Sequence, residues 1–138
     1  MHESVLAELV RDGVVESQHF GHLIALDASG APALIKGNPN ELIYPRSAIK
    51  SIQASAMVRK GLNQEVRSLA LICASHSGSG AHQEVALEIL RSAGLDESAL
   101  QCVVDRPLGA QERKEWGDKA PTRLAMNCSG KHAGMLAT

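Results

Sequence analysis

The chain has 138 residues, 44% of which are apolar, and a formal net charge of −1 at neutral pH. This length is enough for one hydrophobic core, so we expect a single domain over residues 1–138. Aromatic residues make up 2% of the chain, too few for the stacking surfaces that bind single-stranded nucleic acid. Because the net charge offers no attraction for a polyanion either, the composition argues against a nucleic-acid partner.

The sequence also argues against membrane insertion and secretion. It contains no apolar run of about 18 residues, and it begins without the basic and hydrophobic regions of a secretory signal. The three cysteines, Cys73, Cys102 and Cys128, form no short-spaced pair. Such cysteines are typical of reduced thiols rather than of a disulfide framework or a zinc site made by cysteines alone. We therefore expect a cytoplasmic protein with no membrane partner.

The first forty residues predict an antiparallel meander, because apolar stretches alternate there with turn sequences. The expected strands cover residues 5–10, 14–26 and 33–35, and the turns between them cover residues 11–13 and 27–30.

After residue 44 the pattern becomes helical. The expected helices cover residues 47–59, 65–74, 82–93 and 133–137, with a short helical turn at residues 96–100. A buried strand is the alternative for the apolar residues 65–74, for which we favour a helix. In the first of them, Ile49, Ile52, Ala56 and Met57 recur near helical period. Residues 75–80 read as a loop and residues 106–121 as a polar surface stretch. Strands followed by helices predict an α+β fold.

Ser47 and Lys50 are the most informative pair in the chain. At positions i and i+3 of a helix they share one face, so the lysine amine can reach the serine hydroxyl. A serine needs a base to become a nucleophile, and the N-terminus of a helix favours developing negative charge. The spacing suggests a Ser-x-x-Lys nucleophile pair. The alternative is an N-cap serine beside a solvated lysine.

Two further segments carry chemistry. In residues 75–80, Ser75 and Ser77 can relay a proton or bind a substrate carboxylate, while the glycines allow close approach of a ligand. The alternative is a surface loop that caps the next helix. Residues 128–132 place a thiol, an amine and an imidazole together, as in a metal site or beside an activated cysteine. The alternative there is a buried structural Cys128 with a solvent-facing lysine and histidine.

Three strings occur in an order that resembles the L-asparaginase II family of thermolabile, rhizobial type. They are Pro45-Arg46-Ser47-Ala48-Ile49-Lys50, Cys73-Ala74-Ser75-His76-Ser77-Gly78 and Asn127-Cys128-Ser129-Gly130-Lys131-His132-Ala133-Gly134-Met135. The resemblance implies a fold similar to serine β-lactamases and glutaminases. It also implies hydrolysis of a small-molecule substrate, L-asparagine, to L-aspartate and ammonia.

The resemblance assigns roles to individual residues. It implies that Ser47 is the nucleophile, Lys50 its base and Ser75 the second active-site serine, with Ser77 so close that it stays an alternative for that role. Arg46 and Ser77 are expected to bind substrate. The resemblance further implies that Cys128 and Lys131 are two ligands of a zinc ion, a ligand set that is incomplete in this chain.

Because of two departures from the family pattern, other functions have to be considered for this chain. Ser79 stands where a glutamate is expected, which removes a charge near the site. Members of the family are longer, so we expect the N-terminal part of an incomplete domain, associated with a second copy or with a missing C-terminal half. One alternative function is a glutaminase or penicillin-recognising acyl enzyme. The other is a truncated, non-catalytic module that oligomerises or binds a ligand.

Overall fold

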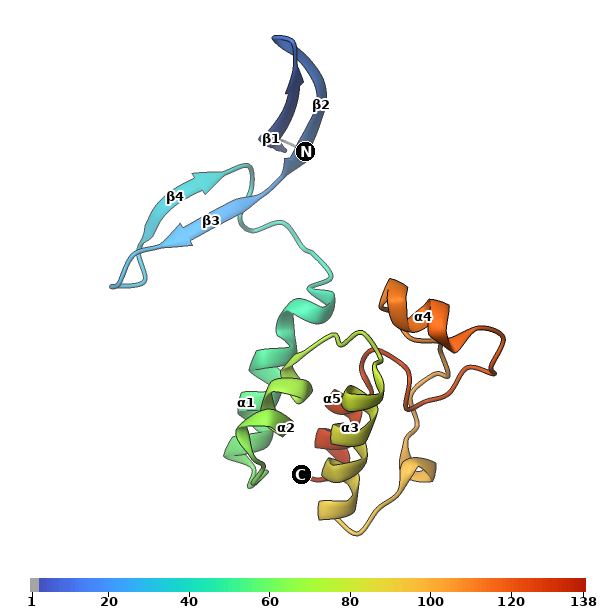
Figure 1. Cartoon of the computed structure of the whole chain (residues 1–138). Helices are drawn as coiled ribbons and strands as arrows, with labels where there is room; N and C mark the ends of the chain where they lie inside the picture. The colour runs from blue at the N-terminus through green and yellow to red at the C-terminus, as the bar shows by residue number, and fades with distance from the viewer. Residues whose placement is uncertain (1–2) are drawn as a thin grey trace. The chain divides into compact units, whose positions relative to one another are not determined.

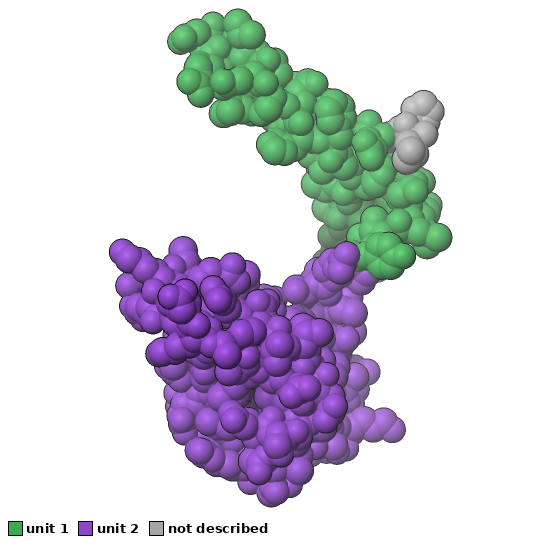
Figure 2. All heavy atoms as spheres, turned by 90° about the vertical axis from the view of Figure 1, so that its right-hand side faces the viewer, with its two compact units in different colours: residues 1–44 green, residues 45–138 purple. Residues whose placement is uncertain are grey.

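The structure is a computed structural model that describes residues 3–138. The chain divides into two compact units, residues 1–44 and residues 45–138, which Figure 2 colours separately. The strands lie in the first unit and the helices in the second, so the predicted α+β class is confirmed (Figure 1). None of the helices among residues 3–138 combines the length and apolar character needed to cross a membrane. The single domain over residues 1–138 stays a prediction.

The first unit consists of two antiparallel hairpins (Figure 1). Strand β1 (Ser4–Arg11) pairs with β2 (Val14–Gly21), and β3 (Leu23–Leu26) pairs with β4 (Pro32–Lys36). Both predicted turns are present. Gly13, in the first of them, has a φ of 77°, a conformation that glycine adopts without the steric cost of a side chain.

The predicted continuous strand over residues 14–26 is wrong, and with it the three-stranded meander. The chain leaves β2 at Gly21 and begins β3 at Leu23, so that each strand pairs within its own hairpin. His22 occupies the break, where its Nδ1 accepts a hydrogen bond of 2.9 Å from the N–H of Asn38. This contact ties the break to the segment after β4. No residue among residues 3–44 is buried, which leaves the apolar side chains of the strands exposed.

The second unit is helical. Its elements are the 3₁₀ turn η1 (Arg46–Ile49), α1 (Lys50–Arg59), α2 (Val66–Cys73), α3 (Gly80–Ser92), the 3₁₀ turn η2 (Glu97–Ala99), α4 (Ala110–Trp116) and α5 (Ser129–Leu136). The core lies between α1, α2, α3 and α5, whose arrangement Figure 1 shows. Ile72, Ile89 and Leu90 are fully buried in this core. The positions of the predicted helices are therefore confirmed, although the first begins as a 3₁₀ turn.

Glycines in α5 let it pack closely against α2. A Cβ atom on Gly130 would lie 2.6 Å from Cγ of Leu71, and one on Gly134 would lie 2.8 Å from Cδ1 of Ile72. Real Cβ atoms do not approach other atoms so closely, and close packing of the core leaves no room to move away. The glycines of the Asn127–Met135 string thus set the position of α5, and with it that of Cys128 at its start.

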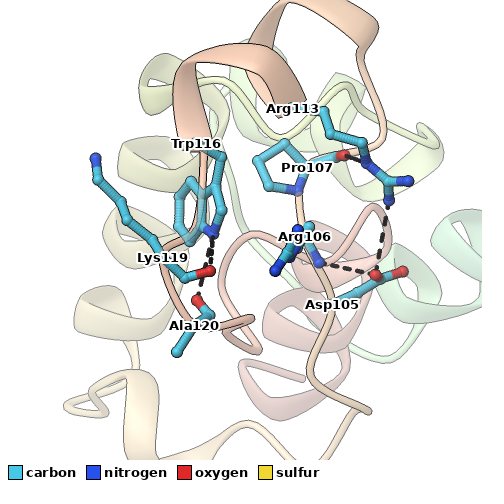
Figure 3. A network of polar contacts seen from close by, with 7 residues as sticks. All are labelled: Asp105, Arg106, Pro107, Arg113, Trp116, Lys119 and Ala120. Carbon is cyan, nitrogen blue, oxygen red and sulfur yellow. Dashed lines mark hydrogen bonds and ion pairs between the residues drawn. The ribbon is translucent and has the colours of Figure 1, made fainter.

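Residues 106–121 are mostly exposed, as the prediction of a polar surface stretch requires, and they contain the helix α4, which their polar pattern did not indicate. The side chains of Trp116 and Arg113 hold it to the flanking chain (Figure 3). The indole Nε1 of Trp116 donates to the carbonyls of Lys119 and Ala120 at 3.1 and 3.3 Å. Nε of Arg113 donates to the carbonyl of Pro107 at 3.0 Å. Because these hydrogen bonds hold α4 in place, the helix does not need to bury apolar side chains. Its sequence therefore shows no helical repeat of apolar residues.

Candidate active site

Ser47 and Lys50 lie at the junction between η1 and α1. Ser47 is exposed within the 3₁₀ turn, whereas Lys50, the first residue of α1, is only 3% exposed. Arg46, just before the serine, has a φ of 48°. That left-handed conformation is costly for a bulky residue and is often found at functional sites. An accessible hydroxyl and a buried amine therefore lie three residues apart in the chain.

The buried amine of Lys50 is held by three acceptors. Its Nζ donates to the carbonyl of Ala74 at 2.8 Å, to Oγ of Ser75 at 2.8 Å and to Sγ of Cys128 at 3.0 Å. Three acceptors match the three N–H bonds of a protonated lysine. A buried ammonium without such partners would be strongly destabilising. The three sequence strings therefore meet at one nitrogen atom.

Ser75 connects this amine to Ser47. The hydroxyls of Ser75 and Ser47 lie 3.0 Å apart, and Ser75 is exposed like Ser47. The hydrogen-bonded path from Lys50 to Ser47 thus runs through Ser75, rather than directly across one helical turn. Since a hydroxyl both donates and accepts, Ser75 can pass a proton between the two groups.

His76 anchors the loop that carries Ser75. Its Nδ1 accepts from the N–H of Gly78 at 3.2 Å, so the ring proton lies on Nε2, which is 3.0 Å from Oγ of Ser129. The backbone N–H of His76 also donates to the carbonyl of Asn127 at 3.1 Å. Burial, reinforced by the positive charges of His82 and Lys50, lowers the pKa of His76 from 6.5 to about 4. A neutral histidine therefore joins the Cys73–Gly78 string to the Asn127–Met135 string, a role that its sequence context did not indicate.

The hydroxyl of Ser77 contacts other groups than the hydroxyl of Ser75 does. The Ser77 hydroxyl donates to Oε1 of Glu112 at 2.5 Å and lies 3.3 Å from Nδ1 of His82. The hydrogen bond from Ser77, together with the nearby His82, keeps the pKa of the Glu112 carboxyl below its usual range. Glu112 comes from α4, the helix missed in the sequence, and places a carboxylate beside Ser77. A carboxylate from another part of the chain therefore lies beside Ser77.

The residues expected to bind zinc are partly engaged elsewhere. Cys128 directs its thiol at the amine of Lys50, and Lys131 lies on the first turn of α5. Burial lowers the pKa of His132, and the charges of Lys131 and Lys50 lower it further. Across residues 3–138, no group of three or more histidine, cysteine or acidic side chains is arranged to hold a metal ion. Two donors fall short of the four ligands that a structural zinc takes.

Comparison with protein families decides the affiliation of this chain. A model of the L-asparaginase II family matches residues 7–138. The chain belongs to the L-asparaginase II family. A search of curated proteins finds no match. Membership of this asparaginase family confirms the resemblance that the sequence strings indicated, and it supports an asparaginase-type function in general terms.

Proposed function

We propose that this chain is an amidohydrolase that converts L-asparagine to L-aspartate and ammonia, with Ser47 as nucleophile and Lys50 as base. The observation that carries the proposal is the hydrogen-bonded line from Ser47 through Ser75 to Lys50, with separations of 3.0 and 2.8 Å. The exposed end of this line is a nucleophile that substrate can reach, and the buried end is an amine shielded from water.

The line works as a proton relay when Lys50 is in its neutral form. The Ser47 hydroxyl then donates to Oγ of Ser75, and the Ser75 hydroxyl donates to the lone pair on Nζ of Lys50. As Oγ of Ser47 attacks the side-chain amide carbon, its proton passes to Ser75, whose own proton passes to the amine. The lysine leaves the step as an ammonium that retains Ala74 and Cys128 as acceptors.

The tetrahedral intermediate places negative charge on the former amide oxygen. Ser47 lies where the 3₁₀ turn begins, and the first bond of that turn runs from the N–H of Ala48 to the carbonyl of Pro45 at 3.0 Å. The Ser47 N–H precedes that bond and is the donor that we assign to the oxyanion. The intermediate collapses when the relay returns a proton to the leaving nitrogen, which departs as ammonia. A water molecule then hydrolyses the acyl-enzyme ester by the same route.

The neighbouring charges suit an amino-acid substrate. Arg46 adjoins the nucleophile in sequence, and its guanidinium is the group that we assign to the substrate α-carboxylate. Glu112, held by Ser77, supplies a carboxylate for the substrate α-ammonium group. The opposite charges of the two groups match a zwitterion.

Ammonia release by purified variants tests the proposal. Ser47→Ala is expected to lower kcat by roughly a thousandfold or more, because no other hydroxyl takes its place at the end of the relay. Ser51→Ala is the matched control, since Ser51 is also an exposed serine, four residues further along the chain. Undiminished turnover by Ser47→Ala would overturn the proposal.

The substrate range separates the alternatives. The same assay with glutamine and hydrolysis of a β-lactam distinguish an asparaginase from a glutaminase or a penicillin-recognising acyl enzyme. A folded wild-type chain that hydrolyses none of the three would overturn the amidohydrolase proposal in favour of a non-catalytic module.

A further inference from the structure

A cavity of about 350 Å³ lies between α3 and α4 in the helical unit. Its walls come from α3 and the loop before it, and from α4 and the residues after it. Ser47, Ser75 and Lys50 do not line this cavity, so it is distinct from the proposed relay. Its volume lies at the lower end of the range for small-molecule sites, about 300–1,000 Å³, and suits a ligand of few atoms.

One wall of the cavity is an aromatic surface that is held in place. The indole Nε1 of Trp116 donates to the carbonyls of Lys119 and Ala120 at 3.1 and 3.3 Å, which fixes the ring (Figure 3). Nζ of Lys119 lies over that ring, 5.7 Å from its centroid. An ammonium group within about 6 Å of a tryptophan ring is attracted by its negative face. The chain's own lysine therefore shows that this surface accepts an alkylammonium.

Two carboxylates give the cavity a negative lining. Glu112 and Glu115 both line it, and their hydrogen bonds come from the uncharged side chains of Ser77 and Gln111. Neither carboxylate forms an ion pair with a residue among residues 3–138. The opposing charges are Lys119 and the N-terminus of α3, which carries roughly half a positive charge. The lining therefore stays negative and favours a cation.

We propose that this cavity binds a small primary alkylammonium cation, which replaces the Lys119 ammonium over Trp116 and is held by Glu112 and Glu115. The three N–H donors of such a cation match carboxylate acceptors, and charge-assisted hydrogen bonds are the stronger kind. A free amine and the lysine side chain of another protein share this chemistry. The small volume of the cavity commits the proposal to the free amine.

Glu112 connects this cavity to the proposed active site. It lines the cavity and also accepts from Ser77, where we assign it to the substrate α-ammonium group. This part of the inference rests on the function proposed above, whereas binding of the amine rests on the cavity alone. A cation held by Glu112 weakens its hold on the substrate, and such coupling is reciprocal. The amine is therefore expected to raise KM for asparagine and to leave kcat unchanged.

Nuclear magnetic resonance of the nitrogen-labelled full chain tests the inference. Because the chain has one tryptophan, its spectrum has a single indole N–H signal, which reports on the cavity. We expect n-butylammonium chloride to shift this signal saturably, with a Kd of about 1 mM. Potassium chloride at equal concentration, the control for ionic strength, should not shift it.

Three variants identify the groups that hold the amine. Lys119→Ala removes the competing cation and should bind n-butylammonium about two- to fivefold more tightly. Glu115→Gln should weaken binding by about the same factor. Lys114→Ala is the matched control, since Lys114 is an exposed lysine of α4 that does not line the cavity. Its affinity should equal that of the wild type.

Three results would overturn the inference. One is an indole signal that does not shift saturably with n-butylammonium. The second is a stronger response to butyrate, which would assign the cavity to an anion at the N-terminus of α3. The third is tighter binding of the peptide acetyl-Gly-Lys-Gly-amide, which would replace the free amine by a protein lysine.

The activity assay separates this inference from the proposed function. Binding of n-butylammonium by a chain that releases no ammonia would support the cavity site and refute the amidohydrolase. Binding without a change in KM would support the cavity site and refute Glu112 as the group that holds the substrate ammonium.

Discussion

Nζ of Lys50 lies 2.8 Å from Oγ of Ser75, although the two residues are 25 positions apart in the chain. Because Ser75 also contacts Ser47, the three residues Lys50, Ser75 and Ser47 form a continuous line of hydrogen bonds. The lysine is held by residues from two other segments, so its position does not depend on its own helix alone. We expect the properties of the proposed nucleophile to depend strongly on Ser75.

Replacing Ser75 by alanine should break the relay while leaving both ends in place. We expect kcat for ammonia release to fall by about 10²–10⁴-fold, the usual contribution of a positioned proton-transfer group. Ser77→Ala is the matched control, since Ser77 contacts Glu112 and His82 rather than the line. Its effect should fall on KM. A larger loss of kcat in Ser77→Ala than in Ser75→Ala would exchange the roles of the two serines.

Lys50→Arg separates charge from basicity. A guanidinium keeps the positive charge and the donor capacity that Ala74 and Cys128 require, but it does not give up its proton. We expect turnover to fall as far as in Ser47→Ala, measured by steady-state ammonia release. Lys60→Arg, at the exposed end of α1, is the control and should retain wild-type turnover. Activity preserved in Lys50→Arg would contradict a base at this position.

The sequence predicted the order of the elements well but not the burial of the lysine. Apolar periodicity selects Ile52 for the inner face of α1, yet Ile52 is 69% exposed, while Lys50 is buried together with Ala54 and Met57. A charged residue enters a core only when partners satisfy it. Those partners, Ala74 and Cys128 among them, are distant in sequence and leave no periodic signal.

The same reason explains what was missed around the loop after α2. His76 is buried through bonds to Gly78 and Ser129, and Glu112 reaches Ser77 from a helix without an apolar face. Local propensity and periodicity do not encode such contacts. The resemblance to the family pointed to Ser47 and Lys50 from the sequence. That the two are connected through Ser75 could be seen only in the folded structure.

Gly130→Ala should destabilise the helical unit, because its Cβ would lie 2.6 Å from Cγ of Leu71 and 3.1 Å from the carbonyl oxygen of Leu71. Overpacking of this kind costs about 1–3 kcal/mol in free energy of unfolding, which denaturant titration measures. Gly80→Ala is the control: Gly80 is exposed at the start of α3, and the added methyl group would meet no atom within 4 Å outside its own chain neighbours and helix backbone. Equal stability of the two variants would contradict the close packing of α5 on α2.

The strands of residues 4–36 should support self-association. Val14, Phe20 and Leu26 are 67%, 56% and 58% exposed, and isolated two-stranded sheets are only marginally stable in water. We expect a second copy to cover these side chains, so that light scattering shows a molar mass that rises with concentration. Phe20→Ser should weaken the association, while His19→Ser, at an exposed polar neighbour, should not. A monomer at every concentration would contradict this prediction.

The neutral His76 should make stability fall in weak acid. Its pKa is 6.5 in the ordinary state and about 4 in the folded chain, so between these values the unfolded chain binds a proton that the folded chain does not. The stabilising contribution of the neutral His76 is complete above pH 6.5. The free energy of unfolding decreases as the pH falls from 6.5 toward 4, by about 3 kcal/mol in total. Below pH 4 both states bind the proton, and this contribution stays constant.

Denaturant titrations of wild type and His76→Gln from pH 8 to pH 4, a range of about four units around the ordinary histidine pKa, measure this contribution. Glutamine keeps a donor for Ser129 but has no group that titrates in the window, so the variant should lose the extra slope between pH 6.5 and 4. Carboxylates such as Glu112 titrate in both proteins and cancel in the difference. His19→Gln, on an exposed strand, controls for the loss of an imidazole. An unchanged slope in His76→Gln would show that the buried ring is not what couples folding to protons.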